Sequence, residues 1–355
     1  MDADLLALTE ALCAIPSVSG NEAALADDVE QRLRRDAPAL TVERIGHNVI
    51  ARTDHGLPTR VVLGGHLDTV PPNDNATPRR DGDTLHGLGT ADMKGGLAVL
   101  LSIAAGLSDA RPQRDVTFVF YEGEEVADEH NGLRRLFAER AELVAGDLAI
   151  LLEPTGGWVE AGCQGTIHVR ATFDGQRAHS ARPWMGVNAI HKAAPLLERV
   201  AGFAAETVAV DGLDYRESLQ VVRVEGGIAN NVVPDRCSVV INRRYAPSRS
   251  LEGAVAAVRA LCVEAGADAI DVVNASPAAP PNLWNPLVAE LVGVYNLPVR
   301  PKLGWTDVAR FAAHGIPALN LGPGDPELAH TAKEFVTSAD LEGCAAVLRS
   351  LLGTE

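Results

Sequence analysis

Residues 59–68 read TRVVLGGHLD, and the predicted fold is built outward from this stretch. Its apolar run has the length and composition of a buried β-strand, and it ends at His66, with Asp68 two residues further on. Apolar runs at 115–121 and 147–152 repeat this pattern. Runs of this kind are typical of strands that are buried on both faces of a sheet.

Helical patterns separate these runs and follow them. Residues 94–107 and 129–143 have helical spacing, residues 316–321 predict a further buried strand, and residues 338–352 predict an amphipathic helix. Alternation of strands and helices indicates an α/β domain. Residues 5–15 predict another amphipathic helix, and they lack the basic region and long apolar core of a signal peptide.

The middle of the chain has a different order of elements, β-α-β-β-α-β, which is that of the ferredoxin-like fold. The predicted elements span residues 165–173, 187–201, 218–225, 236–244, 250–265 and 268–274. A proline-rich stretch at 276–281 predicts the linker that returns to the first domain. We therefore expect one discontinuous domain, residues 1–162 and 277–355, interrupted by an inserted domain, residues 163–276.

The composition of the 355-residue chain fits a globular protein, since 46% of its residues are hydrophobic and 22% are charged. Asp and Glu outnumber Lys and Arg by 47 to 31, a formal net charge of −16, which argues against nucleic acid or an anionic membrane as a partner. No apolar run reaches transmembrane length. The five cysteines are scattered, so we expect no disulfide framework, no cysteine zinc site and a cytoplasmic location.

Side chains that can bind a metal ion follow the predicted strands of the α/β domain. They are His66 and Asp68, Asp92 in a glycine-rich loop, Glu124 and Glu125, Glu153, and His330. Ligands of open α/β sheets bind outside the carboxyl ends of the strands, so these side chains should converge in space. Histidine and carboxylate are the ligand types of catalytic zinc sites.

Each of these pieces also has a plainer explanation. A histidine two residues before an aspartate usually forms only a local hydrogen bond with it, and two adjacent glutamates usually lie in a solvated loop. The glycine-rich residues 87–96 could simply turn into a helix, and they lack the Walker spacing of a phosphate loop. Glu153 could end a strand, and His330 could lie on the surface. Their joint occurrence at successive strand ends favours one shared site.

Together these residues resemble the zinc aminoacylase/carboxypeptidase family of co-catalytic metallopeptidases over nearly the whole chain. Within it, the chain is similar to the actinobacterial type of succinyl-diaminopimelate desuccinylases. The supporting segments are residues 178–191, 226–234, 242–245 and 304–311. The resemblance implies an α/β catalytic domain with a mixed sheet of the di-zinc aminopeptidase-like type. It also implies that the inserted ferredoxin-like α+β domain serves as a dimerisation or lid domain.

The resemblance implies two Zn²⁺ ions per subunit, which Co²⁺ could replace. By this resemblance, His66 and Glu153 would bind one ion and Glu125 and His330 the other. The carboxylate of Asp92 would bridge the two ions. Such a bridge is typical of two-metal hydrolases. Asp68 would accept the remaining N–H of the His66 imidazole and fix its tautomer. A cis peptide bond after Asp92 is a further implication.

The resemblance assigns Glu124 as the general base, which takes a proton from the attacking water and returns it to the leaving amine. It assigns His179, reaching in from the partner subunit, to the tetrahedral oxyanion together with a zinc ion. His179 could instead be a structural histidine at the start of a helix. The role in trans implies a homodimer that forms through the inserted domain.

Substrate-binding residues follow from the resemblance less directly. The candidates are Asn230, Asn231, Arg244 and Arg182 on the insert, with Gly304 and Thr306 on the catalytic domain. Arginine is the expected reader of a carboxylate, although Arg244 could also be a charge on a strand surface. The chain departs from better-known desuccinylases at two places: Cys163-Gln164-Gly165-Thr166 replaces Arg-Arg-Gly-Ser, and Gly304-Trp305-Thr306-Asp307 replaces Gly-Thr-Ser-Asp.

The implied reaction is hydrolysis of N-succinyl-LL-2,6-diaminopimelate to succinate and LL-2,6-diaminopimelate, in lysine and cell-wall precursor synthesis. The departures leave two related activities open, an acetylornithine deacetylase-like N-acyl-amino-acid deacylase and a zinc carboxypeptidase. A non-catalytic metal-dependent binding protein on the same fold is a third alternative. The presence of Glu124 beside a full set of ligands favours an enzyme, because binding alone does not require a base.

Overall fold

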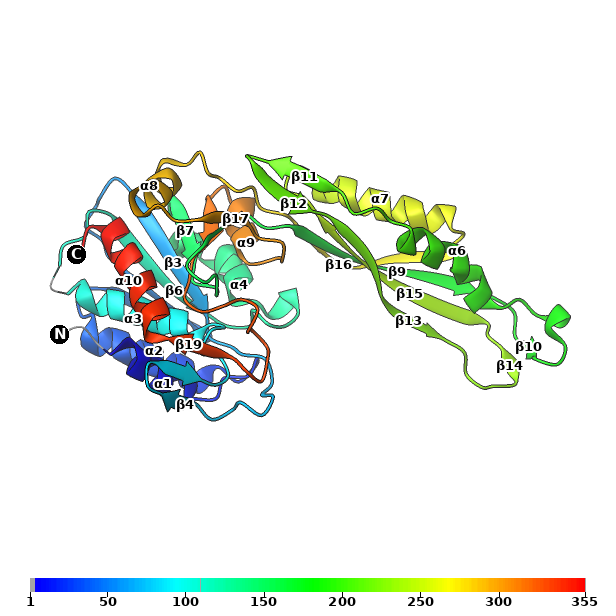
Figure 1. Cartoon of the computed structure of the whole chain (residues 1–355), viewed down its shortest axis with the longest axis horizontal. Coiled ribbons are helices and arrows are strands. Elements are labelled where there is room, and N and C mark those ends of the chain that lie inside the picture. The colour runs from blue at the N-terminus through cyan, green and yellow to red at the C-terminus, as the bar shows by residue number, and fades with distance from the viewer. Residues whose placement is uncertain (1–3, 109, 355) are drawn as a thin grey trace. The chain divides into compact units, whose positions relative to one another are not determined.

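The structure is a computed structural model that describes residues 4–108 and 110–354 (Figure 1). Its internal contacts divide the chain into two units. Unit 1 consists of Met1–Ala161, Asn282–Arg300 and Arg310–Glu355, and unit 2 consists of Gly162–Pro281 and Pro301–Ala309. The assignment of the two parts as a catalytic and a dimerisation domain stays a prediction.

One segment groups differently from the prediction. Pro301–Ala309, which carries Gly304 and Thr306, belongs by its contacts to unit 2 and not to the α/β unit. Hydrogen bonds explain this placement. The Gln164 N–H donates to the carbonyl of Lys302 at 3.2 Å, and the indole N–H of Trp305 donates to the carbonyl of Pro277 at 3.0 Å. The segment is therefore tied to both the entry and the exit of the insert.

Unit 1 contains an eight-stranded sheet in the order β1-β2-β6-β3-β7-β18-β8-β17. β6, β3, β7 and β18 are parallel to one another, whereas β1, β2 and β8 pair antiparallel with their neighbours, so the predicted mixed sheet is confirmed. The strands are β1 (Thr41–Ile45), β2 (Asn48–Arg52), β3 (Arg60–His66), β6 (Asp115–Tyr121), β7 (Leu148–Leu151), β8 (Val159–Ala161), β17 (Val299–Pro301) and β18 (Ala318–Asn320). A second sheet joins β19 (Phe335–Thr337), β5 (Thr84–His86) and β4 (Arg79–Asp81).

The helices of unit 1 include α3, which packs on β3 and β6 and is itself contacted by α1, α2 and α10. The helices are α1 (Leu5–Cys13), α2 (Ala23–Asp36), α3 (Lys94–Gly106), α4 (Gly132–Glu139), α5 (Ala141–Val144), α8 (Pro286–Tyr295), α9 (Val308–Ala313) and α10 (Ser338–Leu352), with a 3₁₀ turn, η1 (Asp128–His130). The first two residues of α9 belong to the segment grouped with unit 2. The continuous helix predicted at 129–143 is wrong. The Asn131 side chain caps a new helix at the N–H of Arg134, and the backbone of Arg140 leaves the helical region.

Two glycines let α3 approach the sheet closely. A methyl group on Gly65 in β3 would lie 2.6 Å from Cε of Met93. A methyl group on Gly96 in α3 would lie 2.6 Å from the carbonyl oxygen of Leu152, which follows β7. Backbone cannot move aside, so the contact with the Leu152 carbonyl requires glycine at position 96, whereas a methyl group at position 65 would displace the flexible end of the Met93 side chain. This approach brings the loop before α3, which carries Asp92, against the carboxyl ends of β3 and β7.

Unit 2 contains a four-stranded antiparallel sheet in the order β13-β15-β9-β16, with α6 and α7 packed on it. The elements follow the chain order β-α-β-β-α-β that the sequence predicts for a ferredoxin-like fold: β9 (Gly165–Asp174), α6 (Ala189–Ala201), β13 (Ser218–Gly226), β15 (Arg236–Tyr245), α7 (Leu251–Glu264) and β16 (Ala269–Ser276). Two short pairs extend it, β11 (Thr207–Val210) with β12 (Leu213–Arg216) and β10 (Ala178–His179) with β14 (Val232–Val233), and a 3₁₀ turn, η2 (Pro183–Met185), follows β10.

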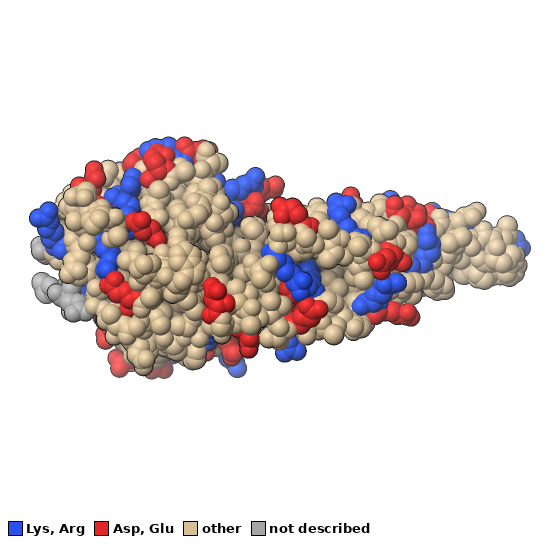
Figure 2. Space-filling model, turned by 90° about the horizontal axis from the view of Figure 1, so that it is seen from above, with Lys and Arg blue, Asp and Glu red and all other residues tan. Residues whose placement is uncertain are grey.

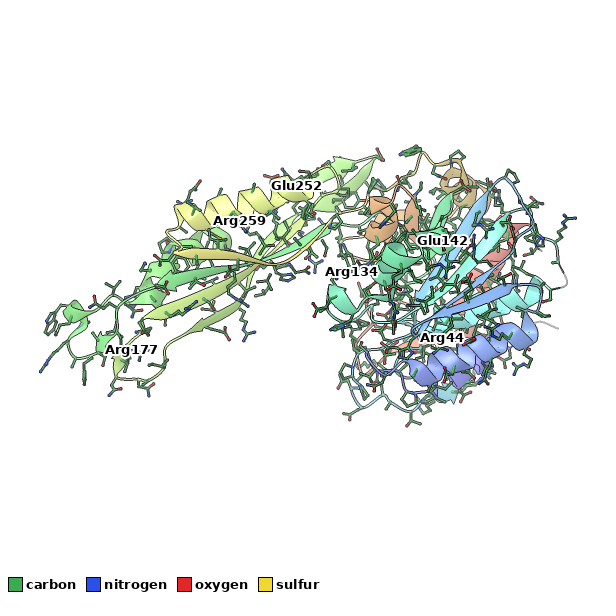
Figure 3. The ribbon with its side chains drawn as sticks, turned by 180° about the vertical axis from the view of Figure 1, so that it is seen from behind. Arg44, Arg134, Glu142, Arg177, Glu252 and Arg259 are labelled. Carbon is green, nitrogen blue, oxygen red and sulfur yellow. The ribbon has the colours of Figure 1, made fainter. Side chains whose placement is uncertain are left out.

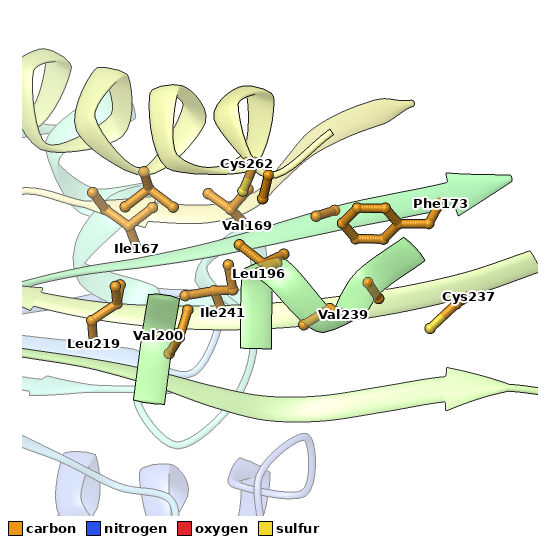
Figure 4. Packing of buried hydrophobic residues seen from close by; sticks show 14 of the residues in the cluster. Ile167, Val169, Phe173, Leu196, Val200, Leu219, Cys237, Val239, Ile241 and Cys262 are labelled. Carbon is orange, nitrogen blue, oxygen red and sulfur yellow. The ribbon is translucent and has the colours of Figure 1, made fainter. Parts of the chain in front are cut away.

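Alternation along the strands of unit 2 separates an apolar face from a polar one. Ile167 and Val169 of β9 and Ile241 of β15 pack with Leu196 of α6 and Cys262 of α7 in a buried cluster (Figure 4). Because side chains alternate along a strand, the residues between them lie on the opposite face of the sheet. That face carries polar side chains, which include Thr166, His168, Asn242 and Arg244.

The described surface is charged but mixed. On the face shown in Figure 2, basic and acidic side chains are interspersed. Many form ion pairs, for example Arg134 with Asp128 at 3.1 Å and Arg177 with Asp235 at 2.9 Å (both arginines are labelled in Figure 3). Within residues 4–108 and 110–354, no helix is long and apolar enough to cross a membrane.

We expect Gly96→Ala to destabilise the protein, because its new methyl group would overlap the Leu152 carbonyl. Overpacking of this kind costs about 1–3 kcal/mol of unfolding free energy. Gly343→Ala is the matched control, since Gly343 lies exposed in α10 with no atom within 4 Å of the added methyl group. There the change should stabilise the helix by about 0.5–1 kcal/mol. Thermal unfolding followed by circular dichroism would measure both, and equal shifts in Tm would contradict the packing argument.

Candidate metal centre

His66 lies at the carboxyl end of β3 and is 1% exposed. Its Nδ1 is 2.9 Å from the main-chain carbonyl oxygen of Asp68 and 3.6 Å from the Asp68 carboxylate. The carbonyl is therefore the nearer acceptor, where the sequence analysis predicted the carboxylate. A donor Nδ1–H leaves Nε2 with its lone pair, which is the form of histidine that binds a metal ion.

Asp92 lies between two imidazoles, and the peptide bond after it is cis, as the resemblance implies. Its Oδ1 is 3.1 Å from Nε2 of His66, and its Oδ2 is 3.3 Å from Nε2 of His330. The same His330 nitrogen is 2.7 Å from Oε1 of Glu125. One carboxylate that faces two separate imidazoles with its two oxygens has the geometry of a bridging metal ligand.

The ligand atoms of the predicted residues form three groups, within each of which they lie no more than 4.8 Å apart. These groups are His66 with Asp92 and Glu153, Asp92 with Glu125 and His330, and His66 with Glu124 and Glu125. The first two share Asp92 and match the two ligand sets that the resemblance implies. The third brings the predicted base Glu124 to the same place.

The carboxylates of the cluster control the charge of its histidines. Burial opposes a charge on His66, yet Asp68, Asp92 and Glu153 raise its pKa above the ordinary value. Hydrogen bonds to Asp92 and Glu125 raise the pKa of His330 to about 10. Because carboxylates outnumber imidazoles in the cluster, it favours a positive charge.

The donor set fits zinc. Imidazole nitrogen and carboxylate oxygen are both zinc ligands, and three protein ligands per ion leave a position for water or substrate. The groups built on His66 and on His330 each supply three such atoms. The arrangement can therefore hold two ions that share Asp92, with the Glu124 carboxylate beside them.

Asp68 holds the segment that follows β6. Its carboxylate is buried and accepts hydrogen bonds from the main-chain N–H groups of Glu124 and Glu125, both at 3.0 Å, and from the hydroxyl of Ser19 at 2.7 Å. Burial opposes ionisation, but His66 and these donors lower the pKa of Asp68 to about 2. An ionised Asp68 thus fixes the backbone of both glutamates.

Glu334 has a comparable role that the sequence analysis missed. It is 1% exposed, and its Oε1 accepts hydrogen bonds from the main-chain N–H groups of Ala91 and Asp92, both at 3.0 Å. Burial raises the pKa of Glu334 to about 7, although these donors oppose the shift. No local spacing marks this residue, because its function depends on a contact between segments that are more than 240 positions apart.

The predicted site residues of unit 2 do not form one cluster. His179 in β10 is exposed, and its Nδ1 accepts a hydrogen bond from the N–H of Ala181 at 3.0 Å. Asn231 accepts from the N–H of Ser180 through its main-chain carbonyl at 2.9 Å. Arg182 and Asn230 are exposed neighbours of these residues along the chain. This group adjoins the end of the sheet where Asp174 pairs with Arg236.

The remaining candidates lie at the other end of the sheet. Arg244 pairs in register with Thr166 of β9 and Ser218 of β13. Gly304 and Thr306 lie on the segment that joins unit 2, where the thiol of Cys163 is 3.8 Å from the carbonyl of Thr306.

Comparison with proteins of known sequence identifies a protein family whose model matches this chain. The family model described as Peptidase family M20/M25/M40 matches residues 62–354. DapE of Mycobacterium tuberculosis is 49% identical over 351 residues, which cover 99% of this chain and 98% of that protein. A succinyl-diaminopimelate desuccinylase of Corynebacterium glutamicum is 45% identical over 354 residues, which cover 98% of this chain and 96% of that protein.

Solved structures agree on the fold. Aminopeptidase PepT of Bacillus cereus matches with a TM-score of 0.79 and 21% identity over 99% of this chain and 97% of that chain. The YXEP protein of Bacillus subtilis, described as a dinuclear metal binding peptidase, matches with a TM-score of 0.72 and 14% identity over 99% and 98%. These matches confirm the predicted fold class. With the family model they lead to one conclusion: the chain belongs to peptidase family M20/M25/M40.

Proposed function

We propose that this chain is a zinc-dependent amide hydrolase that converts N-succinyl-LL-2,6-diaminopimelate and water to succinate and LL-2,6-diaminopimelate. The observation that carries the proposal is the convergence of Glu124 with two ligand groups that share Asp92. Support for the substrate comes from the relative of Corynebacterium glutamicum, which carries the name of this activity at 45% identity. All five cysteines are buried and unpaired, which supports a cytoplasmic location.

Two Zn²⁺ ions per subunit fit the cluster, and Co²⁺ would bind the same donors. His66 and Glu153 would hold one ion, Glu125 and His330 would hold the other, and Asp92 would contribute to both. Zinc, when bound, lowers the pKa of a coordinated water and polarises the amide carbonyl.

Glu124 moves the proton in this reaction. Its carboxylate accepts a proton from the attacking water as the water oxygen bonds to the amide carbon, and it delivers that proton to the nitrogen as the C–N bond breaks. Asp68 positions it, because the Asp68 carboxylate accepts the main-chain N–H groups of Glu124 and Glu125. Hydrolysis yields one carboxylate and one amine, and no oxidant or reductant is needed.

Arg244 binds a substrate carboxylate. The guanidinium is partly buried, and within the described parts of the chain it has no hydrogen-bond or ion-pair partner. Guanidinium binds carboxylate through two parallel hydrogen bonds, so an anionic substrate would satisfy it. Asn230, Asn231, Arg182, Gly304 and Thr306 remain the other candidates for substrate contact.

A second copy of the chain supplies His179. The pairs Asp174–Arg236 and Thr166–Arg244 lie eight residues apart along β15, a distance of about 26 Å at the usual rise of a strand. This exceeds the length of the extended substrate, so the groups at the two ends of one sheet cannot contact the same molecule. Because Nδ1 of His179 accepts from Ala181, Nε2 carries the proton and can donate to an oxyanion.

Exposed apolar side chains near His179 support an interface between two copies. Trp184 is 78% exposed, Met185 is 59% exposed and Ile228 is 65% exposed, all in the loops around β10 and β14. Apolar groups gathered in one place on a surface commonly mark an association site. A homodimer through the insert would cover them and bring His179 to the partner's substrate.

The purified chain with zinc should hydrolyse N-succinyl-LL-2,6-diaminopimelate faster than N-acetylornithine or dipeptides, and a chelator should abolish the activity until zinc is restored. Glu124→Gln should lower kcat by about 10²–10⁴-fold, because the proton acceptor is lost. Metal analysis should show that this variant still binds two zinc ions. Hydrolysis of N-acetylornithine or of peptides in preference would replace the proposed substrate, and no hydrolysis of any of them would overturn the enzyme proposal.

His179→Ala and Glu124→Gln should each be inactive alone, yet regain activity when mixed and allowed to exchange subunits. In the heterodimer, one site keeps both intact residues, so up to a quarter of the wild-type activity is expected from random exchange. The control is Glu124→Gln mixed with the double variant, which has no intact site. Mass measurement must show that subunits have exchanged, and heterodimers without recovered activity would contradict the role in trans.

Glu334→Ala should weaken zinc binding and activity by roughly 10–100-fold, the usual effect of removing a partner that orients a ligand. Glu334→Gln keeps an acceptor oxygen for the N–H groups of Ala91 and Asp92, so it should lose less. Glu327→Ala, an exposed acid on the same segment, is the control. Zinc affinity measured by competition with a chelating dye would be the readout. Equal affinities for all three variants would show that Glu334 does not position Asp92.

A further inference from the structure

The polar face of the unit 2 sheet brings three side chains, Thr166, His168 and Asn242, together beside Arg244. Arg244 of β15 is in register with Thr166 of β9, and Asn242 is in register with His168. Residues two apart in a strand share a face, and diagonal neighbours on adjacent strands are close enough for long side chains to meet. Arg244 and His168 are such a diagonal pair.

Among the described residues, Arg243 has an ion-pair partner and Arg244 has none. Arg243 pairs with the fully buried carboxylate of Glu217 and lies 4.7 Å from the ring centre of Phe203. Arg244 has no such acid among the residues that the structure describes, and burial lowers its pKa. A partly buried cation without a counter-ion is unfavourable, so this position favours an anion from outside the chain.

The amide of Asn242 determines which nitrogen of His168 carries the proton. Its Nδ2 lies 3.1 Å from Nε2 of His168, 3.0 Å from the hydroxyl of Thr166 and 3.3 Å from the carbonyl of Ile167. A carbonyl can only accept, so this atom is the NH₂ group. It has no lone pair that could accept a proton from the ring, so Nε2 of His168 must face it with a lone pair. Nε2 of His168 is then the acceptor, and the proton of the neutral ring is on Nδ1.

The neutral form agrees with the surroundings of the ring. Burial and the nearby charge of Arg244 both lower the pKa of His168. Within the described chain, Nδ1 of His168 makes no hydrogen bond. This face therefore carries two neighbouring donors, the charged guanidinium of Arg244 and the neutral Nδ1–H of His168, that have no acceptor among residues 4–108 and 110–354.

We propose that Arg244 and His168 form one carboxylate receptor, in which the guanidinium binds the anion and Nδ1–H of His168 donates a further hydrogen bond to it. The inference rests on the proposed function and deepens it, because it makes His168 a specificity-determining residue for N-acyl amino acids that carry this carboxylate. Asn242 acts through His168 as a positioning residue, since its amide fixes the tautomer and the ring.

Four substrates test the receptor: N-succinyl-LL-2,6-diaminopimelate and three analogues that each lack one of its carboxylates, namely Nα-succinyl-L-lysine, Nε-succinyl-L-lysine and N-acetyl-LL-2,6-diaminopimelate. The analogue that lacks the carboxylate bound by the receptor should have a wild-type kcat/KM about 10–100-fold below that of the full substrate. This is the effect of losing a hydrogen bond to a charged group. His168→Ala should lower kcat/KM for the full substrate by a similar factor, mainly through KM. For that one analogue, His168→Ala should match the wild type.

His168→Asn keeps an N–H donor near Nδ1 and should recover part of the loss, whereas His191→Ala, at an exposed histidine on α6, should behave as wild type. An equal loss on all four substrates, or no loss, would overturn the receptor. If the wild type hydrolyses none of them, the proposed function fails, and the ¹⁵N signal of the His168 ring tests the receptor directly. Added LL-2,6-diaminopimelate and succinate, which together carry all three carboxylates, should then shift that signal in the wild type and not in Arg244→Ala, and an unmoved wild-type signal with both would overturn it.

Discussion

The position of Asp92 between two imidazoles is the constraint on which the rest of unit 1 depends. Its oxygens lie 3.1 Å from Nε2 of His66 and 3.3 Å from Nε2 of His330. Those histidines follow different strands, so the sheet must bring the two strand ends to one edge. Helix α3 must also pack closely enough to carry the Asp92 loop to that edge, and Gly96 permits this. The position of Asp92 in the cluster therefore depends on the distance between α3 and the sheet.

The same cluster would repel itself without its supports. Asp92, Glu124, Glu125 and Glu153 place four carboxylates around the two histidines, and like charges so close together oppose folding. Two buried carboxylates fix the backbone of these residues by accepting main-chain N–H groups. Asp68 accepts those of Glu124 and Glu125, and Glu334 accepts those of Ala91 and Asp92. Cations would offset the remaining charge, so part of the −16 net charge belongs to a cation site and says little about the charge of the substrate.

Sequence patterns predicted the parts of this arrangement that repeat a local rule. An apolar strand followed by a ligand recurs at His66, Glu125 and Glu153, and the β-α-β-β-α-β order identified the insert. The features that the sequence patterns did not predict depend on contacts between distant segments. Glu334 meets the Asp92 loop only in the folded chain, and residues 301–309 join unit 2 through hydrogen bonds to Gln164 and Pro277. The break at Arg140 depends on one backbone conformation that helical spacing does not encode.

Unit 2 shows how one sheet can serve two purposes. Its apolar face is closed by α6 and α7, so the polar face is free to carry donors that the fold itself does not use. Those donors lie at the Arg244 end, whereas His179 adjoins the Arg236 end, and the two ends are about 26 Å apart along β15. A strand is stiff along its length, and no rotation of side chains closes such a gap. In the proposed function, the two ends act on one molecule from different copies of the chain, so the length of β15 would link catalysis to the proposed dimer.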